Sequence, residues 1–210
     1  MTGTTTAGEK TARAIREKAT ELIFLHGFEA TSLRQIAASV GVKVGSLYNH
    51  INGKEDLLLQ IMGSTMDELM VAQEAALARE VDVIDKIIVL LEVHIRFHAE
   101  HAQVVFIGNS EIRSLSGESR SKITNRRREY QKMIAGVLED AHRDGRAHVI
   151  DARRHTIANL AMGAHVASWF NPRGSASLES IIDAYSKITL RGLGIDNADQ
   201  LVDARKTSRS

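Results

Sequence analysis

The stretch that decides the fold is GVKVGSLYNHINGKEDLLLQ, residues 41–60. It opens on a glycine, mixes apolar and hydrogen-bonding side chains over a few residues, and leads into a new helix near Lys54. Leu47 and Ile51 are four residues apart, so in a helix they share one face. A helix this short is stable only when its apolar face packs on its neighbours. We therefore expect the polar face to be the functional one.

Two amphipathic helices are predicted before this stretch. The first ends at Gly27, and the second begins after Thr31 or Ser32 and ends at Gly41, because hydroxyl side chains favour helix starts and glycine favours helix ends. Two helices joined by a short glycine-containing turn form a helix-turn-helix, whose second helix enters the major groove of DNA. The apolar positions at helical spacing are Ile15, Ala19, Leu22 and Ile23, then Leu33, Ile36, Ala37 and Val40.

The polar face of the short helix has the chemistry of DNA recognition. Serine and asparagine can meet base edges and a small apolar side chain can touch a thymine methyl group, whereas cationic and hydroxyl side chains hold phosphates. The residues expected to project outward are Val44, Gly45, Ser46, Tyr48 and Asn49, with Ser46 and Asn49 meeting base edges, Val44 touching a thymine methyl group and Gly45 permitting close approach of the backbone. The expected contacts to phosphates are Thr31, Ser32, Lys43, Tyr48, His50 and Lys54. The alternative is a tight helical corner in which Tyr48 is partly buried.

Composition supports a helical, intracellular protein. The 210 residues hold one proline, no cysteine and a net charge of only +1, with the basic surplus in the first 54 residues. No hairpin signal or strictly alternating segment is present, so we predict an all-α fold. The N-terminus lacks a secretory signal and no segment is apolar enough to span a membrane, so we expect a cytoplasmic protein without a membrane partner.

Glycines and the single proline divide the chain. A flexible tail is expected at 1–9, a three-helix DNA-binding domain at 10–53, a helical ligand-binding and dimerisation domain at 54–194, and a C-terminal tail at 195–210. Asn52 and Glu55 have the spacing of a capping box at the start of a long fourth helix. Later helices are predicted at 82–99, 102–114, 119–144, 151–170 and 176–192.

Catalysis has little support in this sequence. There is no glycine-rich phosphate loop, nucleophile elbow or His-Glu-x-x-His motif, so we predict neither an enzyme nor a cofactor. His94, His98 and His101 share one helix face and could in principle hold a metal, but hydrogen-bonded core or pocket histidines are the favoured interpretation. We predict no metal site.

The last two predicted helices carry broad apolar faces. Such a pair can meet its copy across a two-fold axis as a four-helix bundle, and the alternative is that both helices close the core of one chain. The residues expected at a dimer interface are Ile157, Leu160, Ala161, Ala164, Ile181, Ile182 and Tyr185.

An arginine pair interrupts the helix predicted at 119–144. Arg127 falls inside an apolar stripe that includes Ile123 and Tyr130, and Arg126 borders it. A guanidinium that faces a core requires an anion. That anion is either an internal carboxylate, from Glu92, Glu111 or Glu118, or an anionic effector. The residues expected around an effector are Arg126, Arg127, Tyr130, His94, His98, Phe106 and Trp169.

The segment ATSLRQIAASVGVKVGSLYNHINGKEDLL, residues 30–58, resembles the DNA-binding segment of the TetR family of bacterial repressors. The shared pattern is Thr, Ile-Ala, Gly-Val, Leu-Tyr-x-His and Lys-Glu, and Ile51 departs from it where the family usually has phenylalanine. The resemblance implies a homodimer that binds operator DNA and a second domain that binds a small effector.

HAQVVFIGNSEIRSL, residues 101–115, followed by NRRREYQKM, residues 125–133, is similar to TetR-type regulators of lipid and steroid catabolism. That similarity implies an acyl-coenzyme A effector. The sequence therefore predicts a ligand-responsive repressor that binds a palindromic operator. The competing interpretation is an architectural DNA-binding protein without an effector.

Overall fold

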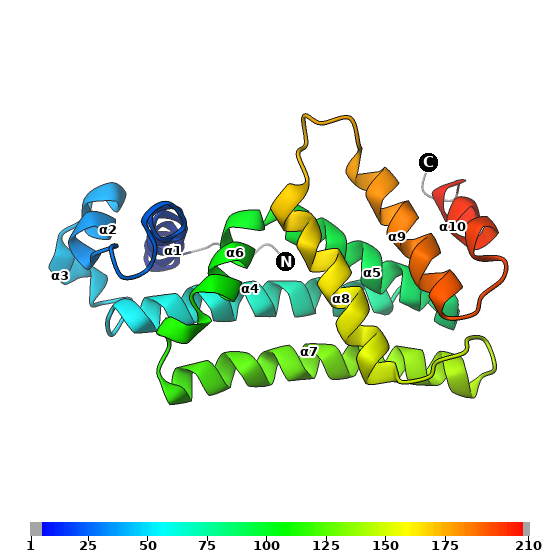
Figure 1. Ribbon diagram of the computed structural model, residues 1–210. Helices are drawn as coiled ribbons and strands as arrows, with labels where there is room; N and C mark the ends of the chain where they lie inside the picture. The colour runs from blue at the N-terminus through cyan, green and yellow to red at the C-terminus, as the bar shows by residue number, and fades with distance from the viewer. Residues whose placement is uncertain (1–5, 208–210) are drawn as a thin grey trace. The chain divides into compact units, whose positions relative to one another are not determined.

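The computed structural model describes residues 6–207, and every regular element within that range is a helix, which confirms the predicted all-α fold (Figure 1). In chain order the elements are α1 (Ala7–His26), α2 (Leu33–Val40), α3 (Val44–Leu47), α4 (Lys54–Leu77), α5 (Val83–Glu100), α6 (Ala102–Ser110), the 3-10 helix η1 (Ile112–Ser114), α7 (Gly117–Arg143), α8 (Ala152–Trp169), α9 (Leu178–Gly192) and α10 (Ala198–Thr207). None of the helices in the described range is both long and apolar enough for a transmembrane segment. The tail expected at 1–9 falls largely on residues 1–5, outside the described residues, and α1 is already formed from Ala7.

The chain forms two compact units that are not continuous in sequence. The first, here called the head unit, contains the chain up to Met66 together with Gln103–Asn125. The second, here called the bundle unit, contains Asp67–Ala102 and the chain from Arg126 onward. Helices α4 and α7 therefore each contribute residues to both units.

The core of the head unit joins its two segments. Ile15, Ile36 and Leu47 from the first three helices are buried in one cluster with Leu57 and Leu58 from α4. The second segment adds further buried apolar residues to the same cluster, namely Ile107, Leu115 and Ile123. The helix-turn-helix thus has its apolar faces covered in part by residues more than 50 positions later in the chain.

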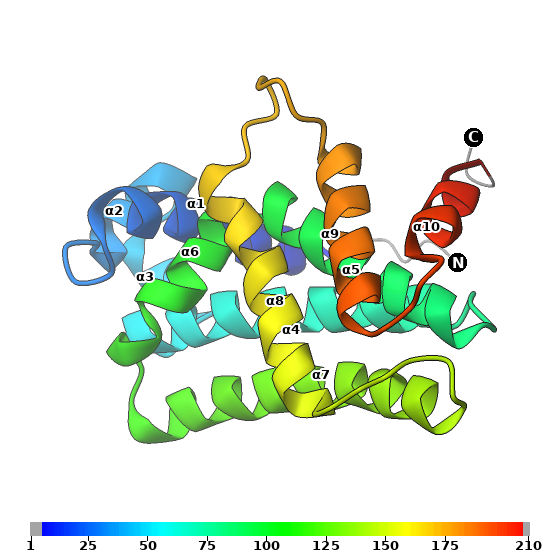
Figure 2. The same ribbon diagram turned by 45° about the vertical axis from the view of Figure 1, so that its right-hand side comes forward.

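The bundle unit is organised around α5, on which both α8 and α9 pack (Figure 2). One buried cluster joins Leu91 and Ile95 of α5 to Val166 of α8 and to Ile181 and Ile182 of α9. A second cluster joins the start of α5, the end of α7, the end of α9 and α10. Because α5 meets helices on several sides, most of its apolar residues are buried.

The C-terminal residues differ from the expected tail. Residues 198–207 form α10, which packs on α9, with Ala198 and Val202 buried in the second cluster. Arg205 donates hydrogen bonds to Glu80 in the loop before α5 and to Asp85 in the first turn of α5. The expectation of a C-terminal tail was wrong. The segment is rich in charged residues, which is typical of a tail, but Ala198 and Val202 are buried and Arg205 is ion-paired.

The start of α4 also differs from the predicted capping box. Asp56, not Glu55, accepts the backbone N–H of Asn52, at 2.8 Å. The Glu55 carboxylate instead accepts the backbone N–H of Ser116, at 2.8 Å, and hydrogen bonds from the side chain and then the backbone of Ser116 lower the pKa of Glu55. Glu55 therefore ties α4 to the segment before α7 within the head unit.

Candidate functional site

The helix-turn-helix forms as its sequence predicts. Ser32 caps α2 in a capping box with Gln35, and Gly41 ends α2 in the left-handed conformation with φ of 79°. Helix α3 is one turn long and is followed by backbone hydrogen bonds from Asn49 to Ser46 and from His50 to Leu47. The predicted helix at 44–50 is thus an α-helical turn that continues into tighter turns.

The face of α3 opposite its core contacts is open. Leu47 is fully buried and Ile51 is 3% exposed, so the apolar face packs into the head unit as predicted. Tyr48 is 57% exposed, which removes the alternative of a partly buried corner. The other exposed positions of this face are Lys43, Val44, Gly45 and Asn49, and Ser46 and His50 are partly exposed.

Gly45 is not required by the protein's own packing. A β-carbon built there would meet no atom within 4 Å, and its φ lies outside the range that favours glycine. The missing side chain instead leaves the backbone at the start of α3 open to close approach from outside. Such an approach suits a helix that enters a DNA groove.

Two of the expected phosphate contacts serve the protein itself. Thr31 is 2% exposed and its hydroxyl donates to the carbonyl of Gly27 at 2.9 Å, so the expectation that it contacts DNA was wrong. The Lys54 ammonium donates to the carbonyls of Phe28 and Glu29, at 2.8 and 3.2 Å, and lies 4.3 Å from the centre of the Phe28 ring. Both side chains hold the turn between α1 and α2, whereas Ser32 remains exposed at the start of α2.

The bundle unit holds a buried hydrogen-bond chain that joins four helices. Gln73 of α4 donates through Nε2 to the carbonyl of Leu90, at 2.9 Å, and to the hydroxyl of Tyr130, at 3.0 Å. That hydroxyl lies 2.9 Å from Nδ1 of His94, and Nε2 of His94 lies 3.0 Å from the carbonyl of Leu160 on α8. Gln73, His94 and Tyr130 are all nearly or fully buried.

Only one arrangement of protons satisfies this chain. The Leu160 carbonyl can only accept, so Nε2 of His94 carries the proton, and Nδ1 accepts from the Tyr130 hydroxyl. Burial lowers the pKa of His94 well below its ordinary value, which agrees with a neutral ring, and burial raises the pKa of Tyr130. Both nitrogens of His94 are therefore engaged, as expected for a hydrogen-bonded core histidine and not for a metal ligand.

The two neighbouring histidines bond to their own helix. His98 Nδ1 lies 2.8 Å from the carbonyl of His94, and His101 Nδ1 lies 2.9 Å from the carbonyl of Phe97. The pKa of His98 is lowered, mainly by burial and in part by the nearby charges of His101 and Arg127. His98 thus lies next to the buried chain, with its ring 4.0 Å from that of His94.

One member of the arginine pair has a carboxylate partner on another helix. Arg126 forms an ion pair with Asp67 of α4, at 3.3 Å. Arg127 is partly buried, and burial lowers its pKa. An Asp67 partner could not be identified from the sequence because the pairing depends on how α4 and α7 pack.

Two other residues expected around an effector, Phe106 and Trp169, have exposed side chains. Phe106 belongs to the head unit, is 54% exposed and contacts the edge of Phe24 with a centroid distance of 5.4 Å. Trp169 is 44% exposed at the last residue of α8. Apolar character alone did not distinguish surface aromatic residues from pocket residues.

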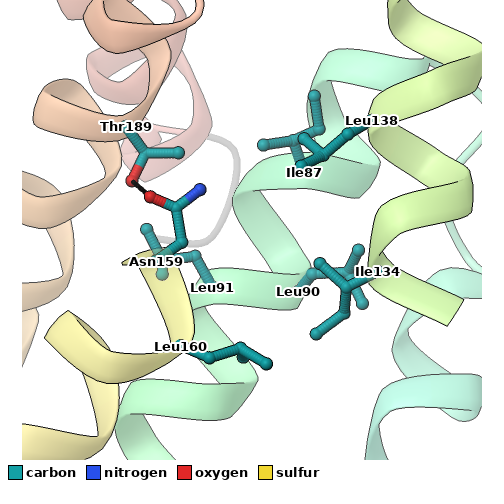
Figure 3. Close-up of a pocket in the computed structure, with 8 residues that line it drawn as sticks. All are labelled: Ile87, Leu90, Leu91, Ile134, Leu138, Asn159, Leu160 and Thr189. Carbon is teal, nitrogen blue, oxygen red and sulfur yellow. Dashed lines mark hydrogen bonds between the residues drawn. The ribbon is translucent and has the colours of Figure 1, made fainter. Parts of the chain in front are cut away.

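A small cavity of about 20 Å³ lies next to the buried chain in the bundle unit (Figure 3). Leu90 and Leu160, whose carbonyls accept from Gln73 and His94, both line it with their side chains. Its wall is otherwise aliphatic except for Asn159 of α8 and Thr189 of α9, and the Thr189 hydroxyl donates to Oδ1 of Asn159 at 3.3 Å. Sequence reasoning missed Asn159, Thr189 and Gln73, although a polar residue inside an apolar helical stripe was a usable signal for Gln73.

The predicted dimer interface divides into two groups. Ile181 and Ile182 are buried in the core with Leu91 and Ile95, so for them the alternative of a single-chain core is correct. Leu160 lines the cavity and Tyr185 packs on the same core. Ile157 is 43% exposed, Ala161 is exposed and Ala164 is partly exposed, and on α9 the exposed apolar residue is Ile188, at 53%.

Comparison with known proteins agrees with this architecture. The family described as "Bacterial regulatory proteins, tetR family" matches residues 15–61, and the one described as "Tetracyclin repressor-like, C-terminal domain" matches residues 80–193. The HTH-type transcriptional repressor KstR2 of Rhodococcus jostii is 26% identical over 169 residues, which cover 80% of this chain and 83% of that protein.

Two solved structures share the fold over nearly their whole length. A bacterial regulatory protein of the tetR family from Rhodococcus RHA1 has a TM-score of 0.82 at 28% identity, over 89% of this chain and 98% of that chain. AibR in complex with isovaleryl coenzyme A and operator DNA has a TM-score of 0.75 at 28% identity, over 83% and 95%. With a helix-turn-helix head and matches to family descriptions on both parts, the chain belongs to the TetR family of transcriptional regulators and is not an enzyme.

Proposed function

We propose that this protein is a repressor that binds a palindromic operator as a homodimer and is released by a small effector. The observation that carries the proposal is the open polar face of α3, backed by the buried residues Leu47 and Ile51. In this proposal Ser46 and Asn49 contact base edges, Val44 contacts a thymine methyl group, and Lys43, Tyr48 and His50 contact phosphates. Ser32 and the free amides at the start of α2 supply a further phosphate contact.

A homodimer is part of the proposal because one small head makes few contacts. A two-fold pair addresses two half-sites roughly 34–36 Å apart, one turn of DNA. The exposed apolar residues Ile157 and Ala161 of α8 and Ile188 of α9 are the surface that we assign to the pairing. Exposed isoleucine and alanine on neighbouring helices favour burial against a copy of the same surface.

The proposed effector is a small hydrophobic or anionic compound, with an acyl-coenzyme A thioester as the first candidate. Support comes from AibR, which was crystallised with isovaleryl coenzyme A, and from the partly buried Arg126 and Arg127 of α7. An arginine fork suits phosphate and carboxylate groups. The aliphatic cavity suits the acyl part.

The size of the cavity suggests how an effector acts. About 20 Å³ accommodates roughly one water molecule and not an acyl chain. Effector entry must therefore separate the helices that line the cavity, so the effector binds a different conformation from the one described here. A ligand shifts an equilibrium by its difference in affinity for two conformations, which is the property that an inducer needs.

The proposal is tested by selecting binding sites for the full chain from a random DNA library. We expect a palindromic site bound by two chains, with an affinity that falls steeply as salt rises and that falls again when isovaleryl-coenzyme A is added. Selection of no common sequence would contradict it. DNA binding that no ligand of the tested classes weakens would instead favour the alternative, an architectural DNA-binding protein.

A further inference from the structure

The cavity in the bundle unit has a polar edge that the rest of its wall does not explain. Six of the eight lining residues are leucine or isoleucine, and the other two, Asn159 and Thr189, bond to each other. In Figure 3 the Asn159 oxygen turns to Thr189, whereas its nitrogen points toward the space between the aliphatic side chains. That amide nitrogen donates no hydrogen bond to any of the described residues.

Two more polar groups nearby lack partners. The hydroxyls of Thr156, three residues before Asn159 on α8, and of Ser186, three residues before Thr189 on α9, are buried with no hydrogen-bond partner among the described residues. Residues three apart on a helix share a face. The unpaired hydroxyls therefore lie on the same faces of α8 and α9 as the polar edge of the cavity.

Unpaired buried polar groups are rare in native proteins and need a physical reason. A core that required only packing would be served better by valine and alanine at 156 and 186, because these have nearly the same shape without the cost of an unmade hydrogen bond. Of the unpaired groups, the Asn159 amide nitrogen belongs to a residue that lines the cavity, and a bound molecule that supplies an oxygen there would satisfy it. Hydrogen-bond donors of this kind, set in an apolar wall, are typical of sites that orient a ligand.

The residues that line the cavity indicate that the ligand group bound there is uncharged. No lysine, arginine, histidine or acidic residue lines the cavity, so a carboxylate or ammonium group there would be buried without a counter-charge, which is costly. A carbonyl or hydroxyl oxygen carries no such cost, and it accepts from the N–H that Asn159 offers.

We propose that Asn159, together with Thr189, selects effectors whose buried part is an aliphatic body with one neutral oxygen, as a ketone, an alcohol or the carbonyl of a thioester. This inference rests on the proposed function in one respect only, that the cavity opens to admit an effector. The inference specifies the chemical class of effector that the opened cavity binds. It also assigns to Asn159 and Thr189 the preference for that class over a plain hydrocarbon or a charged analogue.

The test uses probes that need no knowledge of the natural effector. The full chain, labelled at leucine and isoleucine methyl groups, is titrated by NMR with cyclohexanone, with methylcyclohexane and with cyclohexanecarboxylate. We expect cyclohexanone to shift the methyl signals of Ile87, Leu90 and Leu160 and to bind at least tenfold more tightly than either other probe. The titration is repeated with butyryl-coenzyme A, whose acyl part has only the thioester carbonyl, and with acetoacetyl-coenzyme A, whose acyl chain has a ketone as well. Comparison of the two affinities distinguishes recognition of a thioester oxygen from recognition of an oxygen on the acyl chain.

Variants separate selection from packing. Asn159→Leu is expected to reduce the preference for cyclohexanone over methylcyclohexane at least tenfold, and Thr189→Val to reduce it by a smaller factor. The control Ile87→Val changes the volume of the wall without its polarity, so it should shift the affinity for both probes together. Methyl and backbone spectra of each variant establish that it is folded, and Thr189→Val, which keeps the shape of the side chain, remains informative if Asn159→Leu does not fold.

Equal binding of the two neutral probes, no binding of either, or a preference that survives both substitutions would overturn the inference. Failure of the proposed function gives a different pattern. In that case cyclohexanone is still preferred through Asn159, while neither coenzyme A thioester binds or no operator is selected.

Discussion

Gly163 of α8 and His94 of α5 are so close that a β-carbon at Gly163 would lie 2.6 Å from Cδ2 of the His94 ring. The contact is shorter than packed carbon atoms tolerate, so only glycine lets α8 approach α5 here. The same approach brings the Leu160 carbonyl within 3.0 Å of His94 Nε2. The absence of a side chain at Gly163 thus allows the hydrogen bond between His94 and Leu160 to form.

Gly163→Ala is therefore expected to destabilise the fold. An added methyl group in a packed core costs about 1–3 kcal/mol, and here it must also move the ring that bonds to Leu160. Urea unfolding measures the loss. The matched control is Gly136→Ala on α7, where a β-carbon meets nothing within 4 Å, and where the helix should gain about 0.5–1 kcal/mol. Equal effects of the two substitutions would contradict the close contact.

Tyr130→Phe is expected to cost about 1–3 kcal/mol, since it leaves Nδ1 of His94 without a donor and one N–H of Gln73 without an acceptor. The ring nitrogen signals of His94 in ¹⁵N NMR supply a specific measurement, because the wild type should show the tautomer protonated at Nε2. Tyr185→Phe is the control, because the Tyr185 ring is only partly buried on α9. A variant as stable as the wild type, with an unchanged His94 spectrum, would show that the hydroxyl does not hold the ring.

Stability should fall as the solution becomes acidic. The pKa values of His94 and His98 are lowered in the folded protein from 6.5, so below about pH 6.5 the unfolded chain binds more protons than the folded one. Stability is then complete above that pH and decreases as the pH falls, by up to about 1.4 kcal/mol per pH unit for each histidine that stays neutral. Urea midpoints between pH 7.5 and 5 measure the slope. His98→Gln should reduce the slope, whereas His165→Gln, at an exposed position, should leave it unchanged.

The two lysines near α3 should behave differently. Lys43→Ala, at an exposed position, should weaken binding to all DNA sequences and reduce the salt dependence by about one phosphate contact, without a change in stability. Lys54→Ala should destabilise the head unit, because the Phe28 and Glu29 carbonyls lose their donor. Gel shifts at several salt concentrations and thermal unfolding separate the two effects. Loss of stability in the Lys43 variant would contradict this division.

Sequence discrimination should depend on Ser46 and Asn49. Replacing either with alanine is expected to cost about 1–3 kcal/mol of discrimination against wrong bases, while Tyr48→Ala should weaken all sequences alike. Competition gel shifts with single-base variants of the selected operator measure both quantities. Unchanged discrimination in both variants would remove these residues from base recognition.

The sequence predicted the parts of this molecule that local rules control. Helix starts and ends followed from Ser32, Gly27 and Gly41, and the burial of Leu47 and Ile51 followed from their spacing, because these depend on residues within one or two turns. The resemblance to the TetR family supported the assignment of these helices to a DNA-binding helix-turn-helix.

Long-range contacts could not be predicted in the same way. The pairing of Arg126 with Asp67, the bond from Glu55 to Ser116 and the burial of Ile181 against α5 each join residues more than 50 positions apart. Of the residues expected around an effector, His94 and Tyr130 hydrogen-bond to each other directly, and Gln73, which no motif marks, donates to the same Tyr130 hydroxyl. The polar edge of the cavity comes from Asn159 and Thr189, which have ordinary surroundings in the sequence.

Glu111 and Glu55 join the two segments of the head unit by hydrogen bonds. Glu111 accepts the backbone N–H of Phe28 at 3.4 Å, and Glu55 accepts the backbone N–H of Ser116. A fragment that stops at Met66 would lack Ile107, Leu115 and Ile123 from its core, and would expose the apolar surface that they cover. The helix-turn-helix part of this regulator is accordingly not an independent N-terminal domain. A chimaera that grafts new operator specificity onto another regulator would need residues 103–125 to travel with it.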